Sequence, residues 1–295
     1  MILEKRVPFS YWLNLIKWDL LFVSLSTTIF YFITKEVINI EIPISVGSFL
    51  GTSIALLLSF KLSQSYDRWW EARKVWGSIV NDSRTLVIQI VNLTNNKCEK
   101  EVRTIAIRQI VWCYSLACLL RDQNSIQYLK KWLSEQEIAE LNDSTHIPLS
   151  IIHNQSASLN KIYGNGFVND FQHVHIDSTL VRLVDSLGRC ERIKKTIFPK
   201  TYRLTLRFFI YLFLIILSIS FSVFTSWIAV PLLIAISIPF LMLEKISVNI
   251  QNPFGNKPTD VSISAISKAI EINILNLIGE KAESKLVDDN LFYVM

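Results

Sequence analysis

The chain has 295 residues, of which 51% are hydrophobic and 12% aromatic, and its mean hydropathy is +0.34. A soluble domain does not carry this much apolar surface, so part of the chain is expected to lie in lipid. The net charge of +5 is a mild excess of cations, which suits an anionic membrane surface and is too small to indicate a nucleic-acid partner.

Four stretches are apolar over roughly 20 residues, the length that a helix needs to cross a bilayer. They are residues 18–34, 43–60, 208–224 and 227–243. The third and fourth are separated only by Thr225 and Ser226, which predicts a tight helical hairpin. Pro231 and Pro239 predict kinks in the last span.

Lysine and arginine are distributed unevenly around these spans. Cations precede the first span, follow the second and precede the third, whereas only Lys35 lies between the first two spans and none lies between the last two. By the positive-inside rule, both termini and the long middle section are therefore expected on the cytosolic side of the cell membrane.

The pattern as a whole predicts an all-α protein in four parts. These are an N-terminal segment with the first two spans (1–60), a helical cytosolic domain (61–202), the last two spans (203–245) and a C-terminal cytosolic segment (246–295). Residues 104–120 are apolar enough for a fifth span, but arginines at both ends favour a buried cytosolic helix. Residues 146–170, with Pro148, Gly164 and Gly166, predict a loop-rich connection.

The second span differs from the other three in composition. Gly47, Gly51 and Ala55 are spaced four apart and form a stripe of small residues, which lets helices approach closely in lipid. Another face carries the apolar side chains Ile42, Val46 and Leu50. If several copies of the chain pack through the small stripe, this apolar face surrounds a narrow hydrophobic passage. A helix that only packs within its own chain explains the same spacing.

The segment after the second span combines tryptophan with charge. Trp69, Trp70 and Trp76 lie where a helix would leave the membrane, and a belt of aromatic side chains is expected there. Interleaved arginine and tryptophan also suggest nucleic-acid binding, but the position beside a span favours the belt.

Three motifs resemble one known family. They are IPISVGSFLGTSIALLLSFKLSQSYDRWWEARKVWGSIVNDSRTL (42–86), GRCERIKKTIFP (188–199) and NIQNPFG (249–255). In this order and spacing they are similar to the bestrophin family of ion channels, in particular its bacterial branch. The resemblance implies a homopentamer of all-helical subunits around one axial pore in the lipid membrane. It also implies a pore neck at Ile42, Val46 and Leu50 and a cytosolic aperture near Ile176.

The chain departs from the family pattern at two places. Eukaryotic members bind calcium through a dense acidic run after the Asn-Pro-Phe-Gly motif, whereas this chain has QNPFGNKPTD, with only Asp260 nearby. A calcium site needs six or more oxygen ligands, so no calcium gate of that kind is expected. The neck positions are aliphatic where animal members have aromatic side chains. Because the family includes anion-selective and cation-selective channels, the sequence leaves the sign of the permeant ion open.

Side chains that could support other chemistry are not arranged for it. The four cysteines have no CxxC spacing and are expected to be buried thiols. His173 and His175 are two residues apart, which does not suit one helix face, and no third metal ligand is evident. The sequence has no phosphate loop and no nucleophile elbow. We therefore expect no metal, no cofactor and no enzymatic activity.

The leading hypothesis is a channel that passes small monovalent ions, and we expect chloride-type anions by family precedent. A sodium-selective channel of the same fold is the first alternative. A secondary transporter is the alternative from another class, but transporters usually have inverted repeats and charges near mid-membrane, which these spans lack. A membrane scaffold without conductance is a third interpretation.

Overall fold

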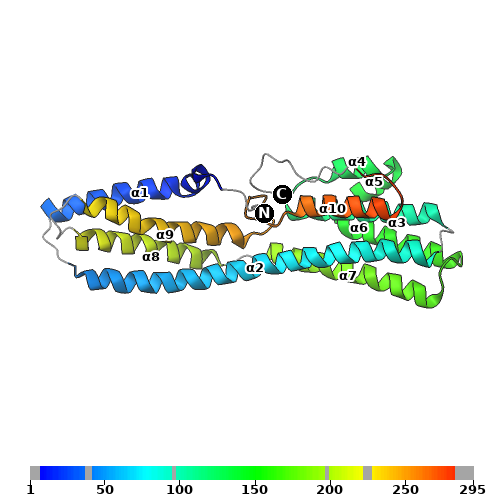
Figure 1. The fold of residues 1–295 in the computed structure, drawn as a ribbon, viewed down its shortest axis with the longest axis horizontal. Coiled ribbons are helices and arrows are strands. Elements are labelled where there is room, and N and C mark those ends of the chain that lie inside the picture. The colour runs from blue at the N-terminus through cyan, green and yellow to red at the C-terminus, as the bar shows by residue number, and fades with distance from the viewer. Residues whose placement is uncertain (1–6, 37–41, 95–97, 197–198, 222–227, 283–295) are drawn as a thin grey trace. The chain divides into compact units, whose positions relative to one another are not determined.

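The computed structural model describes residues 7–36, 42–94, 98–196, 199–221 and 228–282. These residues form ten α-helices and no strand (Figure 1), so the predicted all-α class is confirmed for the described part of the chain. The helices are α1 (Phe9–Glu36), α2 (Ile44–Leu93), α3 (Glu99–Leu120), α4 (Ile126–Trp132), α5 (Glu135–Asn142), α6 (Ile147–Gly164), α7 (Asp170–Lys195), α8 (Lys200–Phe221), α9 (Ala229–Gln251) and α10 (Ile263–Leu277).

The chain divides into two compact units. Unit 1 contains Trp70–Thr196 and the segment that begins at Pro253, and unit 2 contains the described residues of Glu4–Trp69 and Ile197–Asn252. The long helix α2 contributes to both, because its residues up to Trp69 belong to unit 2 and the rest to unit 1. The predicted spans therefore all belong to unit 2.

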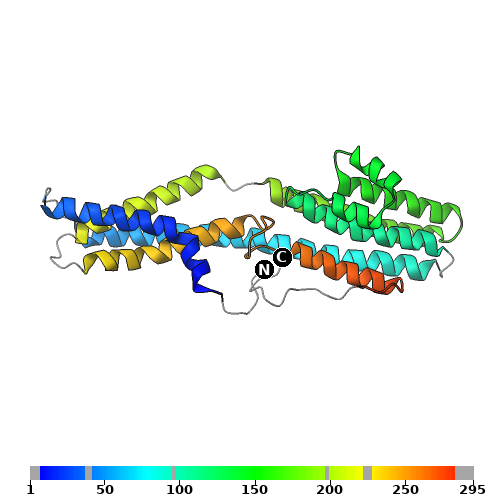
Figure 2. The same cartoon turned by 90° about the horizontal axis from the view of Figure 1, so that it is seen from above.

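Unit 2 is built from α1, the first part of α2, α8 and α9. Helices α1, α8 and α9 contact one another, and α1 and α9 lie side by side in both views, whereas α8 diverges from them toward its N-terminal end (Figures 1 and 2). The core of the unit consists of Ile16, Val23, Ile54, Leu58, Leu206, Ile210, Phe213, Leu214, Leu217, Leu233 and Leu241. All four helices are long and apolar enough to cross a membrane, yet at most 39% of their most apolar windows is buried. Helices that are apolar on their outer faces as well fit a lipid environment.

A fifth helix, α3, also has the length and composition of a span, but it belongs to unit 1. Of its most apolar window, 78% is buried inside the protein. Ile110, Trp112 and Leu116 are each 0% exposed. The apolar side chains of α3 thus pack into the core of unit 1. This burial favours the prediction of four spans over five.

The predicted loop over residues 146–170 is wrong, because most of this stretch forms α6. Pro148 lies in the first turn of the helix, where a missing N–H group costs nothing. His146 caps the helix, since its Nδ1 accepts a hydrogen bond from the N–H of Leu149 at 3.2 Å. Gly166, just beyond the helix, has a φ of +71°. The proline and glycine are therefore signals for the start and the end of a helix.

Two glycines of α2 lie in its contact with side chains of α8 in unit 2. A Cβ atom on Gly47 would lie 3.0 Å from Leu217 Cδ1, and one on Gly51 would lie 3.1 Å from Phe213 Cε2. Both distances are tighter than most Cβ contacts in proteins, so a side chain on either glycine would push Leu217 or Phe213 aside by a few tenths of an ångström. Ala55, the third member of the predicted small stripe, is exposed. The two glycines pack inside the chain, and Ala55 takes no part in that contact.

Glu271 connects three helices of unit 1. Its carboxylate accepts hydrogen bonds from the Tyr114 hydroxyl at 2.5 Å and from Lys268 Nζ at 2.8 Å, and Lys131 Nζ lies 3.3 Å away. The residue is 3% exposed. Burial acts to raise the pKa of this carboxyl, but the hydrogen bonds and the two lysine charges outweigh burial, so the pKa of Glu271 lies below its ordinary value.

Gly51→Val is expected to lower the free energy of unfolding by about 1–3 kcal/mol, because the new side chain would overpack against Phe213. Thermal unfolding of the detergent-solubilised protein, followed by tryptophan fluorescence, measures this effect. Ala55→Val is the control, since it enlarges an exposed side chain of the same helix. An equal loss of stability in both variants would show that the contact with Phe213 is not limiting.

The lowered pKa of Glu271 predicts a specific pH dependence of stability. The ionised carboxylate stabilises the fold above the unfolded-state pKa of about 4.3, and this contribution is lost as the pH falls through the lower folded-state pKa. The unfolding temperature should therefore fall below about pH 5, and less steeply in Glu271→Gln. Glu99→Gln, which removes an exposed carboxyl from the same unit, should keep the wild-type slope. The same slope in Glu271→Gln and wild type would contradict the prediction.

Candidate functional site

The start of α2 carries the residues that the sequence places at a pore neck. Ile42 precedes the helix and is half-buried. The helix begins after Pro43, whose carbonyl accepts a hydrogen bond from the N–H of Val46 at 3.0 Å. Val46 is 41% exposed, while Leu50 is half-buried against the core of unit 2. Their own chain thus covers these side chains only in part, which leaves them available to face another copy or a passage.

Sequence reasoning missed Phe49, which is 73% exposed and directly precedes Leu50. The spacing argument followed every fourth residue from Ile42 and so passed over this position. Leu56, further along α2, is 58% exposed. The uncovered side of α2 is therefore wider than the face formed by Ile42, Val46 and Leu50. The sequence signal that could have identified Phe49 is a large apolar side chain within a stretch rich in glycine and serine.

The same part of α2 has no charge, and three of its hydroxyl side chains donate to its own backbone. Residues 42–60 contain no charged side chain. The hydroxyls of Ser48, Thr52 and Ser53 each donate to the carbonyl four residues earlier, at 3.1, 2.9 and 2.9 Å. These bonds occupy hydroxyl protons that would otherwise need water. An ion beside this stretch would meet apolar side chains and no fixed charge.

The three tryptophans predicted as a membrane-surface belt have different environments. Trp69 is half-buried and Trp70 is 46% exposed. Trp76 is 0% exposed and belongs to the core of unit 1. No surface of Trp76 remains to contact lipid headgroups, so we correct its assignment to that of a core residue. The prediction of a belt is then limited to Trp69 and Trp70, and their place at a membrane surface stays a prediction.

Ile176, predicted near a cytosolic aperture, lies in α7 and is 0% exposed. A side chain that lines an axial passage must be exposed on its own chain, so Ile176 does not fit that role. The exposed apolar side chains of α7 are Phe171 (87%), Val174 (66%), Val181 (54%) and Val184 (38%). Positions 174 and 181 are about two turns apart and share one face of the helix.

Comparison with known proteins identifies the family. Residues 10–276 match the family model described as Bacterial/Fungal Bestrophin protein. The chain belongs to the bestrophin family. The resemblance seen in the three sequence motifs is thereby confirmed.

Bestrophin-family relatives and structures cover most of the chain. A protein from Nostoc sp., named voltage-dependent anion channel-forming protein alr2987, is 30% identical over 246 residues, which are 81% of this chain and 80% of that protein. The Escherichia coli K12 protein YneE, with the same description, is 28% identical over 254 residues, which are 85% of this chain and 83% of that protein. The crystal structure of a bacterial bestrophin homologue from Klebsiella pneumoniae has a TM-score of 0.85 and 28% identity, and the match covers 90% of this chain and 99% of that chain.

The loop after the Asn-Pro-Phe-Gly motif of this bestrophin-family chain uses its carboxylate internally. Asp260 is 0% exposed and accepts hydrogen bonds from the N–H of Lys257 at 2.8 Å and from the hydroxyl of Thr259 at 3.4 Å. Burial raises the pKa of Asp260 above its ordinary value. The hydrogen-bonding capacity of this carboxyl is therefore used within the loop. Across the described ranges, no group of three His, Cys, Asp or Glu side chains is placed to hold a metal ion.

His173 has a hydrogen-bond partner, and the cysteines are buried. His173 pairs through Nε2 with Asn160 Oδ1 at 3.0 Å. The four cysteines are free and buried. Burial raises the pKa of the Cys190 thiol to about 12, so this thiol stays protonated at neutral pH.

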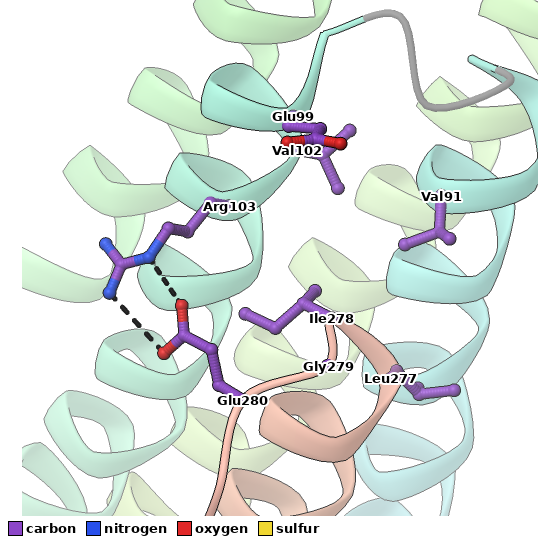
Figure 3. Close-up of a pocket in the computed structure, with 8 residues that line it drawn as sticks. All are labelled: Val91, Glu99, Val102, Arg103, Leu277, Ile278, Gly279 and Glu280. Atoms are coloured by element: carbon purple, nitrogen blue, oxygen red, sulfur yellow. Dashed lines mark hydrogen bonds and ion pairs between the residues drawn. The ribbon is translucent and has the colours of Figure 1, made fainter.

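Unit 1 contains a cavity of about 520 Å³ that involves none of the residues singled out from the sequence. It is lined by Val91, Glu99, Val102, Arg103, Leu277, Ile278, Gly279 and Glu280 (Figure 3). At its edge, Arg103 Nε donates a hydrogen bond to Glu280 Oε1 at 2.6 Å. Two of the charged side chains that line the cavity thus form an ion pair. The lining contains no cysteine, serine or histidine.

Proposed function

We propose that copies of this chain assemble into a channel in the cell membrane that passes small monovalent anions such as chloride. The observation that carries the proposal is family membership, together with relatives that are named voltage-dependent anion channel-forming proteins. The topology that we propose has four spans, with both termini on the cytosolic side.

The proposed assembly is the homopentamer that the family resemblance implies. In it, Ile42, Val46 and Leu50 of each subunit surround the axis and form a hydrophobic neck. The partial exposure of Val46 and the absence of charge in residues 42–60 support this arrangement. A ring of aliphatic side chains disfavours water, so an ion crosses it only after losing part of its hydration shell.

A sodium-selective channel of the same fold remains the alternative. An uncharged neck does not select the sign of an ion by attraction, so neither sign is excluded by these residues. The names of the relatives favour anions.

The double variant Val46→Ala, Leu50→Ala is expected to raise the unitary conductance by at least about twofold, because smaller side chains widen the neck and let water enter it. Single-channel recording in planar bilayers with the purified protein measures this change. Leu56→Ala is the matched control, since it shortens an exposed leucine of the same helix, six residues beyond the proposed neck. A conductance that is unchanged in the double variant, or raised equally in the control, would place the narrowest point elsewhere.

The sign of the permeant ion is tested by the reversal potential in asymmetric NaCl. An anion channel should reverse near the equilibrium potential of chloride. Reversal near the equilibrium potential of sodium would still support a channel, but one that is selective for sodium and not for anions. Saturable exchange without unitary current steps would instead indicate a transporter and contradict the channel itself.

A further inference from the structure

Unit 2 contains a cluster of charges where its apolar helices begin or end. Asp19 on α1 lies at its centre. Arg207 Nη2 on α8 donates to Asp19 Oδ1 at 2.5 Å, and the Tyr211 hydroxyl donates to the same atom at 3.0 Å. Lys245 Nζ on α9 lies 2.8 Å from Asp19 Oδ2. One buried carboxylate thus holds three helices together and has two cations as partners.

A second ion pair lies deeper in the same cluster. Lys61 Nζ is 3.5 Å from Glu244 Oε1, and the two side chains are 0% and 5% exposed. The charge of Lys61 lies within electrostatic reach of Arg203 and Arg207. This pair is closed to outside ligands, and its two charges offset each other.

The charges of the cluster do not balance. Arg203 has no acidic side chain within ion-pairing distance among the described residues. Within the described part of unit 2, the carboxylates that pair with these cations are Asp19 and Glu244, whereas the cations number four: Lys61, Arg203, Arg207 and Lys245. Counted over these residues, the cluster has an excess of two positive charges. Uncompensated charge at the edge of an apolar layer is costly, so a negatively charged group is expected to complete the cluster.

The outer cations are reachable and border an apolar surface. The side chains of Arg207 and Lys245 are 38% and 27% exposed. Exposed apolar residues flank the cluster along α1 and α8: Trp18 (73%), Leu204 (61%) and Phe208 (62%). A ligand that binds both the exposed cations and the neighbouring apolar side chains has a negatively charged head group and an apolar tail. Tryptophan beside lysine and arginine is also typical of the headgroup level of a membrane.

We propose that Arg203, Arg207 and Lys245 bind the phosphate of an anionic phospholipid, whose acyl chains lie over the exposed apolar faces of α1 and α8. Arg203 contributes a charge that has no ion-pair partner among the described residues. Arg207 and Lys245 donate to the phosphate through the N–H groups that do not bind Asp19. Asp19 competes with the lipid for the same two cations, so it sets the affinity of the site.

The site is tested by native mass spectrometry of the purified full-length protein, titrated in detergent with phosphatidylglycerol or with phosphatidylcholine. The wild type should retain phosphatidylglycerol preferentially, and Arg203→Gln should lower its binding about fivefold, as expected for one cation near an anionic headgroup. Arg189→Gln is the matched control, because it removes an exposed arginine from unit 1 and should leave lipid binding unchanged. Equal binding of the two lipids, or equal effects of the two variants, would overturn the proposal.

Asp19→Asn gives a second and opposite test. If Asp19 competes with the phosphate, its neutralisation should raise phosphatidylglycerol binding about fivefold. If the cluster only holds the helices together, phosphatidylglycerol binding should not rise. Size-exclusion chromatography checks that the variant is folded, and the Arg203→Gln result stands alone if it is not. Displacement of the lipid by an equal concentration of inorganic phosphate would identify a site for free anions and overturn the lipid assignment. Because lipid is counted and no current is recorded, the result does not depend on the channel proposal.

Discussion

The close contact between α2 and α8 determines which side of α2 is left for function. Gly47 and Gly51 allow Leu217 and Phe213 to lie directly against the α2 backbone, so the glycine face of the helix is closed inside the chain. A helix presents its side chains at fixed angles, and closing one face leaves Val46 on an uncovered side. The position of the proposed neck therefore depends on a packing contact made by a different face of the same helix.

The class of the fold was predictable because the physical constraint is strong. Long apolar runs with cations on one side have few solutions other than membrane helices, since each backbone polar group must be satisfied within the helix. The region of α6 was mispredicted because the effect of proline and glycine depends on their position. In the middle of a helix they interrupt it, whereas at its ends, as Pro148 and Gly166 do here, they mark where it starts and stops. The number of prolines and glycines in a stretch does not distinguish these two cases. Their position relative to the periodic apolar residues of the helix does.

The environment of individual side chains was harder to predict. Trp76 and Ile176 are both fully buried, although sequence reasoning placed one at a membrane surface and the other at an aperture. An apolar residue in a helix has the same pattern whether it faces its own core or a partner. Asp19 shows the opposite case, because its charge at the start of an apolar run is visible in the sequence, while its partners Arg207 and Lys245 lie 188 and 226 residues further along the chain, on α8 and α9.

An uncharged neck makes hydration the basis of ion selection. Residues 42–60 have no charge, and the carboxylates of Asp19 and Glu244 are already paired with lysine or arginine. An apolar ring then discriminates by the energy that each ion needs to shed water. Chloride holds its hydration shell less tightly than sodium, so the same ring opposes sodium more strongly. In the proposed channel, preference for an anion therefore requires no cation in the neck, and the proposed aliphatic ring at the start of α2 is compatible with the anion channels named among its relatives.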